Sequence, residues 1–116
     1  MLQGQMAVDV MRSTFDQRRS SLRVQMAIPA GITCPDKSER QHTALVRDVS
    51  FSGAFVYSDF APEVASNIVI DFVFPVVERR MRVTCRGVVV RVEKSAKGGA
   101  TGIAMLFHKH EATVIH

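Results

Sequence analysis

The sequence lacks several features that mark large classes of protein. It has no apolar run approaching the roughly 18 residues that a membrane-spanning helix needs. Its first 17 residues contain no long apolar core of the kind found in secretory signal peptides, so export is not indicated. Only two cysteines are present, Cys34 and Cys85, which is too few for the disulfide framework of a small secreted domain. Together these absences favour a reduced, cytoplasmic setting.

The motifs that accompany catalysis are also missing. The sequence contains no P-loop, no dinucleotide-binding glycine fingerprint and no Gly-x-Ser-x-Gly nucleophile turn. His108 and His110 have the spacing of neighbours on one strand face, but no motif supplies a third metal ligand, which favours exposed histidines near the C-terminus over a metal site. The sequence therefore predicts a protein without catalytic activity, metal or cofactor.

The composition is that of a single globular domain with a strong preference for arginine. The 116 residues allow one core, and 47% of them are hydrophobic while 22% are charged. The net charge is +4, and 11 of the 15 basic residues are arginine. A guanidinium group offers a planar fork for phosphate, carboxylate or guanine edges and a flat face that stacks on rings. This bias favours an anionic, flat ligand, although arginines that merely solubilise exposed strand faces would give the same composition.

Short stretches of alternating polar and apolar residues, separated by turn formers, predict an all-β domain. Six strands are expected, at Val24–Thr33, Thr43–Val49, Ala54–Tyr57, Asn67–Phe74, Arg80–Glu93 and Thr101–Phe107. Six short strands in this order indicate a small antiparallel β-barrel. Residues 1–16 are expected to form an extension or linker, with a short helix over Ala7–Gln17 as one form of it, residues 17–108 the barrel domain, and residues 109–116 a C-terminal tail.

The fifth strand carries a signal for a β-bulge. Its apolar face reaches Cys85, which is most simply a small buried hydrophobe. Beyond Gly87 the alternation shifts by one position, because Val88, Val90 and Val92 now form the apolar set. Such a shift at a glycine predicts a bulge there, of the kind that bends strands around barrel corners.

Arginines in an R-x-x-x-R spacing occur twice. With this much arginine the spacing alone carries little information. Arg82 and Arg86 lie inside an alternating strand, where an exposed face is the simple interpretation. In contrast, Arg18, Arg19 and Arg23 lie in a polar segment just before the first strand, where their side chains can fold over a ligand.

A second motif, D-x-S-x-x-G, stands at the end of the second expected strand. Asp48 and Ser50 share one side of the chain and offer an ionised acceptor beside a hydroxyl. Gly53 permits a positive φ and lets a ligand approach the backbone closely. A turn in which Asp48 and Ser50 bond local backbone amides is the competing interpretation.

The two motifs together, with the six-strand pattern and the closing segment Thr101–Phe107, resemble the PilZ domain family. The resemblance extends from about Gln17 to Phe107, with Ser52 standing where many members have a second glycine. It implies a six-stranded β-barrel that acts as a non-catalytic receptor for the bacterial second messenger cyclic di-GMP.

The resemblance also implies roles for individual residues. Arg19 and Arg23 are similar to the two arginines that wrap the nucleotide, and Asp48 and Ser50 to the polar pair that holds a guanine edge. Gly53 would keep the surface open. We add Arg18 as a candidate that stacks on guanine or helps to hold a second ligand molecule.

Three functional hypotheses follow. In the first, cyclic di-GMP orders the segment Gln17–Arg23 against the barrel and so signals to a protein partner or a fused effector domain. In the second, the chain is a PilZ-like interaction domain that binds no nucleotide. The third, a basic barrel for single-stranded nucleic acid, is disfavoured because Tyr57 is the only clear strand tyrosine and most phenylalanines fall on inward positions.

Overall fold

The described part of the chain forms an all-β structure. The computed structural model describes residues 24–76, 79–94 and 99–115, and these form six β-strands. The strands are β1 (Val24–Thr33), β2 (His42–Val49), β3 (Gly53–Ser58), β4 (Asn67–Val76), β5 (Arg79–Glu93) and β6 (Thr101–Ile115). The predicted all-β class and the six strands are confirmed. The extension and helix predicted near the N-terminus lie outside the described residues. No helix within the described part of the chain is long and apolar enough to cross a membrane.

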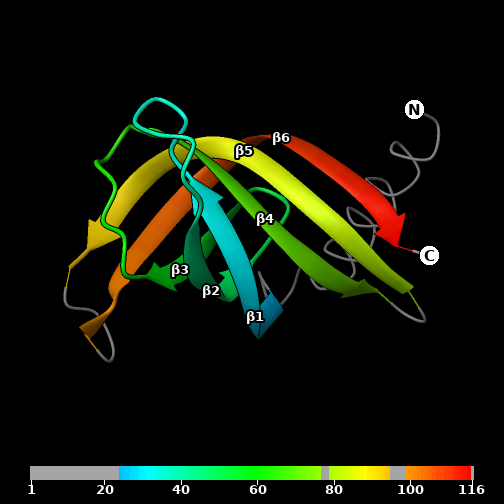
Figure 1. Cartoon of the computed structure of the whole chain (residues 1–116). Helices are drawn as coiled ribbons and strands as arrows, with labels where there is room; N and C mark the ends of the chain where they lie inside the picture. Colours follow the sequence, from blue (N-terminus) through cyan, green and yellow to red (C-terminus); the bar gives the residue numbers. More distant parts are fainter. Residues whose placement is uncertain (1–23, 77–78, 95–98, 116) are drawn as a thin grey trace.

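The strands close into an antiparallel barrel. Around the barrel their order is β1-β2-β3-β6-β5-β4, and β1 pairs with β4 to complete the ring. Figure 1 shows β4, β5 and β6 as long curved strands that run side by side across the view. The ring of pairings among the described strands is closed, so the predicted barrel architecture is confirmed.

The barrel interior is filled by apolar side chains from every strand. Each strand contributes one β-branched residue with no exposed surface: Ile32, Val46, Val56, Ile70, Val83 and Ile103. Branched side chains suit this position because they are stiff and pack well on a pleated surface. Burying each of them contributes roughly 1.5–3 kcal/mol to folding. Cys85 belongs to the same core, as the sequence pattern predicts.

The bulge in β5 lies further along the strand than the sequence predicts. Cys85, Gly87 and Val89 are all buried, so the inward face continues past Gly87 without a shift. The register of β5 shifts instead between Val89 and Arg91, and Val90 is the additional residue. The prediction of a parity change at Gly87 is therefore wrong by three positions. Consecutive valines hid the true position, because no polar residue among them marks the outer face.

Gly87 marks a different irregularity, on the neighbouring strand. Arg86 pairs with Lys109 and Gly87 with Phe107, so the additional residue there is His108 of β6. A Cβ atom at Gly87 would overlap the Leu106 carbonyl oxygen, so glycine is required by the close approach of β6.

The last strand is longer than predicted. It continues to Ile115, and Cys85 pairs with His110 while Arg80 pairs with Ile115. Residues 109–115 are thus part of the sheet and do not form a tail. His108 is exposed as expected, but His110 is half-buried, which corrects the expectation that both are exposed. The alternation in this segment is masked by its histidines, which suit either face.

The buried thiol of Cys85 makes stability depend on pH. The residue is 2% exposed, and its pKa is raised to about 12, first by burial and then by the nearby Asp71 charge. In the unfolded chain the thiol loses its proton near pH 9. Because the folded state keeps the proton up to a higher pH, this stabilisation is complete below about pH 9 and is lost as pH rises toward 12.

We therefore expect the free energy of unfolding to fall between about pH 9 and 11 more steeply for the unaltered chain than for Cys85→Val. The difference should approach about 1.4 kcal/mol per pH unit. Urea unfolding of both chains across this pH range measures it. Parallel pH profiles would show that the thiol does not carry this dependence.

A candidate ligand groove on the barrel wall

The three described residues of the D-x-S-x-x-G motif lie together around one groove. Asp48, Ser50 and Gly53 line a hollow of about 370 Å³, which the outer faces of β3, β6 and β5 extend. Ala54 and Val56 of β3 belong to the core, so the groove-lining Phe55 between them belongs to the outer wall. Asp48 and Ser50 thus line the same groove, in agreement with the sequence pattern, which places them on one side of the chain.

A β-bulge in β2 turns Asp48 toward this groove. Val46 lies in the core opposite Val56, and the next pair along β2 is Asp48 opposite Phe55. Arg47 is the additional residue. Strict alternation would place Asp48 on the inward face of Val46, whereas the bulge directs both Arg47 and Asp48 outward.

Arg47 supplies a countercharge for the Asp48 carboxylate. The Arg47 Nε donates to Asp48 Oδ2 at 2.9 Å, and Asp48 is only 4% exposed. The Arg47 guanidinium also lies over the Phe55 ring, with Cζ 3.8 Å from the ring centroid. Burial lowers the pKa of Arg47, but hydrogen bonds with Tyr57 and Asp48 raise it by more, to a net increase. The arginine therefore stays charged and offsets the desolvation of the carboxylate.

The loop after Asp48 is held by its own hydrogen bonds. The Ser50 backbone N–H donates to the Gly53 carbonyl at 2.8 Å. The Ser50 hydroxyl lies 3.1 Å from the Ser52 hydroxyl and donates to the Gly53 carbonyl at 3.4 Å. These bonds go to a carbonyl and a hydroxyl, not to the backbone amides that the turn interpretation invoked. A hydroxyl oxygen has two lone pairs, so Ser50 can also accept from a ligand in the groove.

Gly53 is required for packing and not for an unusual backbone angle. Among the glycines of the described residues, only Gly99 has a positive φ, so Gly53 does not adopt the positive φ that a glycine permits. A Cβ atom at Gly53 would overlap the Met105 carbonyl oxygen of β6. The glycine therefore allows β3 and β6 to approach where the groove begins.

His110 of β6 anchors the motif loop, and nothing in the sequence pattern indicated this. Its ring stacks on Phe51 with centroids 4.0 Å apart, and its Nε2 lies 2.5 Å from the Phe51 carbonyl oxygen. Phe107 packs its ring edge against His110, and its backbone N–H donates to the Ser52 carbonyl at 2.8 Å. Only the pairing of β3 with β6 brings these residues together, so the loop is fixed to the barrel by tertiary contacts.

The predicted arginines Arg18, Arg19 and Arg23 lie outside the described residues. The described chain begins directly after them, at Val24, which pairs with Val49. Groove residues that the sequence did not single out include Phe55, Arg91 and Leu106.

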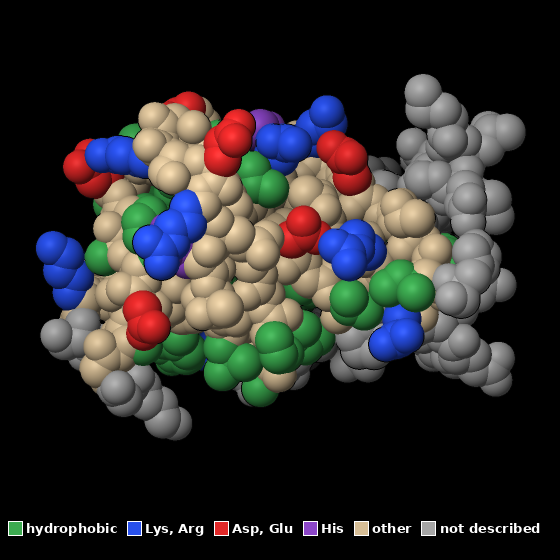
Figure 2. All heavy atoms as spheres, viewed as in Figure 1, with side chains coloured by type: hydrophobic (Ala, Val, Ile, Leu, Met, Phe, Trp, Pro, Cys, Tyr) green, Lys and Arg blue, Asp and Glu red, His purple; other side chains and the backbone are tan. Residues whose placement is uncertain are grey.

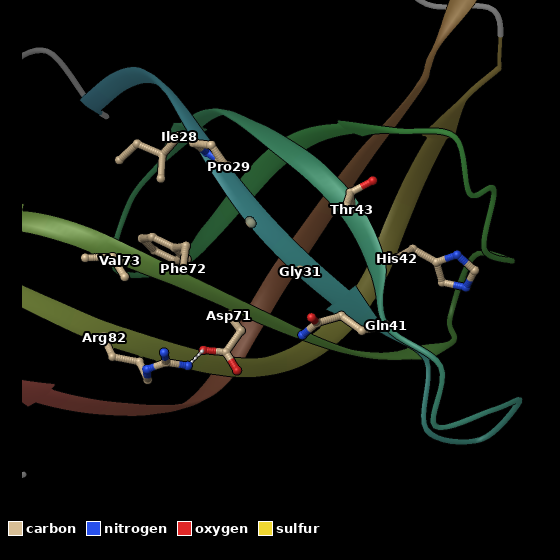
Figure 3. Close-up of a pocket in the computed structure, with 11 residues that line it drawn as sticks. Ile28, Pro29, Gly31, Gln41, His42, Thr43, Asp71, Phe72, Val73 and Arg82 are labelled. Carbon is tan, nitrogen blue, oxygen red and sulfur yellow. Dashed lines mark ion pairs between the residues drawn. The ribbon is translucent and has the colours of Figure 1, made fainter.

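A second and larger hollow, of about 510 Å³, lies over β1 and holds none of the predicted site residues. Figure 3 shows Gly31 at its centre, with Asp71 and Arg82 facing each other on one side. The Arg82 guanidinium lies 3.8 Å from Asp71 Oδ1, which also accepts from the Thr84 hydroxyl at 3.1 Å. These polar groups satisfy one another, so the hollow by itself indicates no ligand.

The surface charges do not form one block on the face seen in Figure 2, where basic and acidic side chains are interspersed. Within residues 24–76, 79–94 and 99–115, no group of three histidine, cysteine or acidic side chains is placed to hold a metal ion.

The packing role of Gly53 can be measured. We expect Gly53→Ala to lower the free energy of unfolding by roughly 1–3 kcal/mol, because the added methyl group overlaps the backbone of β6. Ser52→Ala is the matched control on an exposed neighbouring position and should change it by less than about 0.5 kcal/mol. Chemical denaturation of both variants makes the comparison. Equal effects would contradict the close-approach explanation.

Comparison with known structures and sequences relates this barrel to a protein family. The structure of the Bacillus subtilis inhibitor of motility MotI/DgrA is similar, with a TM-score of 0.65 and 15% sequence identity. The match covers 75% of this chain and 41% of that chain, so this chain corresponds to less than half of that protein, and at this identity the likeness shows the fold alone. No curated protein matches the sequence. The family model of the PilZ domain matches residues 17–114, and the chain therefore belongs to the PilZ domain family.

Proposed function

We propose that this chain is a cytoplasmic receptor module that binds cyclic di-GMP in the groove beside Asp48. PilZ domains are generally non-catalytic receptor domains, which supports a binding role. In the proposal, Arg19 and Arg23 wrap the nucleotide and contact its phosphate and guanine groups. Asp48 and Ser50 hold a guanine edge, and Gly53 leaves the mouth of the groove open.

The pairing of β1 with β2 is the observation that carries the proposal. Val24 pairs with Val49 and Gln25 with Asp48, so the beginning of β1 lies beside the end of β2. Arg23 is covalently bonded to Val24. The described chain therefore begins, one residue after Arg23, beside the end of β2 that carries Asp48, and this supports a site shared by the two motifs.

The chemistry of the groove suits a guanine base. Guanine presents N–H groups that can donate hydrogen bonds to an ionised carboxylate. Such charge-assisted bonds are among the strongest hydrogen bonds in proteins. The Asp48 carboxylate is already desolvated and held by Arg47, so binding does not require its removal from water. Arginine forks complement the ligand phosphates and can stack on the base, the role we also assign to Arg18.

A signal follows if the ligand bridges a segment of the chain and the rigid barrel. In the proposed mechanism, cyclic di-GMP contacts the arginine segment and the D-x-S-x-x-G loop at once, and this shifts the population of the Gln17–Arg23 segment toward a docked state. A protein partner or a fused effector domain would detect that change. The division into an extension over residues 1–16 and a barrel domain is part of this proposal.

The proposal predicts tight and motif-dependent binding. We expect titration calorimetry to show micromolar or tighter binding of cyclic di-GMP to the unaltered chain. Arg19→Ala, Arg23→Ala and Asp48→Ala should each weaken it about tenfold or more, because each removes a charged hydrogen bond of about 1.5–3 kcal/mol. The stoichiometry measures whether one or two ligand molecules bind.

Arg86→Ala provides the control. Arg86 belongs to the second R-x-x-x-R pair, and it is exposed on β5 away from the groove residues. Its removal should leave the affinity unchanged. A folded chain that takes up no cyclic di-GMP would contradict the receptor function and favour a PilZ-like interaction domain that binds no nucleotide.

A further inference from the structure

A second β-bulge shapes the side of the groove that lies opposite Asp48. We call these two sides, which carry Asp48 and Arg91, the banks of the groove. On β5, Val89 lies in the core and pairs with Met105, whereas Arg91 pairs with Ala104. Val90 is the additional residue, and both Val90 and Arg91 are exposed. With strict alternation Arg91 would share the inward face of Val89. The bulge therefore turns an arginine outward into the groove, as the bulge in β2 does for Asp48.

Asp48 and Arg91 stand at the two ends of one row of residues across the barrel wall. Asp48 pairs with Phe55, Phe55 with Ala104, and Ala104 with Arg91. Three inter-strand steps of about 4.8 Å separate the ends, which is about 14 Å along the wall. The small side chain of Ala104 keeps the floor of the groove low between them. The backbone positions of Asp48 and Arg91 thus lie on opposite sides of a shared floor, over which the Arg91 guanidinium reaches toward the Phe55 ring.

Arg91 is available for an anionic ligand. Its side chain is 62% exposed, and its guanidinium carbon lies 5.8 Å from the Phe55 ring centroid. Its ion-pair partner is Glu93, with Nε 3.0 Å from Oε2. Because exposed ion pairs contribute little to stability, the guanidinium can exchange this partner for a ligand at small energetic cost. Glu93 would also repel a phosphate placed beside Arg91.

We propose that Arg91 is a further ligand-binding residue, which takes a phosphodiester group of the cyclic dinucleotide on the bank opposite Asp48. This inference rests on the proposed function, because it assigns a ligand-binding role to a residue on the second bank of the same groove. The ligand carries both kinds of group that the two banks need, a base with N–H donors and a phosphodiester. A guanidinium fork binds a phosphodiester through two parallel hydrogen bonds, while Asp48 on the facing bank accepts from the base. Glu93 is the neighbour that weakens this contact.

Substitutions at Arg91 and Glu93 should act in opposite directions. With cyclic di-GMP as the probe, titration of the full chain should give a Kd for Arg91→Gln about tenfold or more above that of the unaltered chain. Arg91→Lys, which keeps the charge but not the fork, should give an intermediate Kd. Glu93→Gln removes the competing carboxylate and should lower the Kd about two- to threefold. A packing role of the ion pair cannot produce this opposition, because either substitution breaks the pair equally.

The salt dependence gives a second readout. Screening weakens a contact between exposed charges, so raising the salt from about 50 to 200 mM should raise the Kd of the unaltered chain more than that of Arg91→Gln. Arg86→Gln, an exposed arginine of the same strand, is the matched control and should behave as the unaltered chain. Melting temperatures test whether each variant is folded. If Arg91→Gln does not fold, Arg91→Lys takes its place in the comparison.

The outcomes separate this inference from the function on which it rests. If the unaltered chain binds, and Asp48→Ala abolishes binding while Arg91→Gln does not alter it, the role of Arg91 is overturned and the receptor function stands. An equal loss of affinity in Arg91→Gln and Glu93→Gln would also overturn it, in favour of a structural ion pair. Absence of binding by the unaltered chain overturns both.

Discussion

The closed ring of strands is the constraint on which the rest of this structure depends. Because β1 pairs with both β2 and β4, each strand must send alternate side chains into one shared interior. Buried apolar side chains from every strand fill that interior, among them Ile32 of β1 and Ile103 of β6. Alternation then fixes which side chains can reach the outer wall, so a polar group can act there only by its position in the strand or through a local break in the alternation.

Two such breaks place opposite charges around one groove. The bulge at Arg47 directs Asp48 outward, and the bulge at Val90 does the same for Arg91. Each bulge leaves the core residues on either side of it in place, so the barrel keeps its packing while its outer wall gains charged groups. Bulges next to binding sites commonly serve this purpose, since they redirect one side chain without changing the fold.

The loop between β2 and β3 is held in place by β6, the strand that pairs with β3. His110 stacks on Phe51, the Phe107 amide bonds to Ser52, and Gly53 lets the two strands approach. A binding loop attached to a rigid element at several points loses little freedom when a ligand arrives, which favours affinity. The position of this loop therefore depends on β6, whose final residues carry no recognisable binding motif.

The local alternation of polar and apolar residues determined much of the fold of this protein. Alternation predicted the six strands, the barrel and the burial of Cys85, and the spacing of Asp48 and Ser50 indicated a shared side of the chain. The tertiary structure alone decided the position of the bulge at Val90, the anchoring role of His110 and the placement of Asp48 and Arg91 in one row across four strands. The physical reason is that strand propensity and alternation are local properties of the chain. Register shifts and contacts between strands, in contrast, depend on how distant segments fit around a closed core.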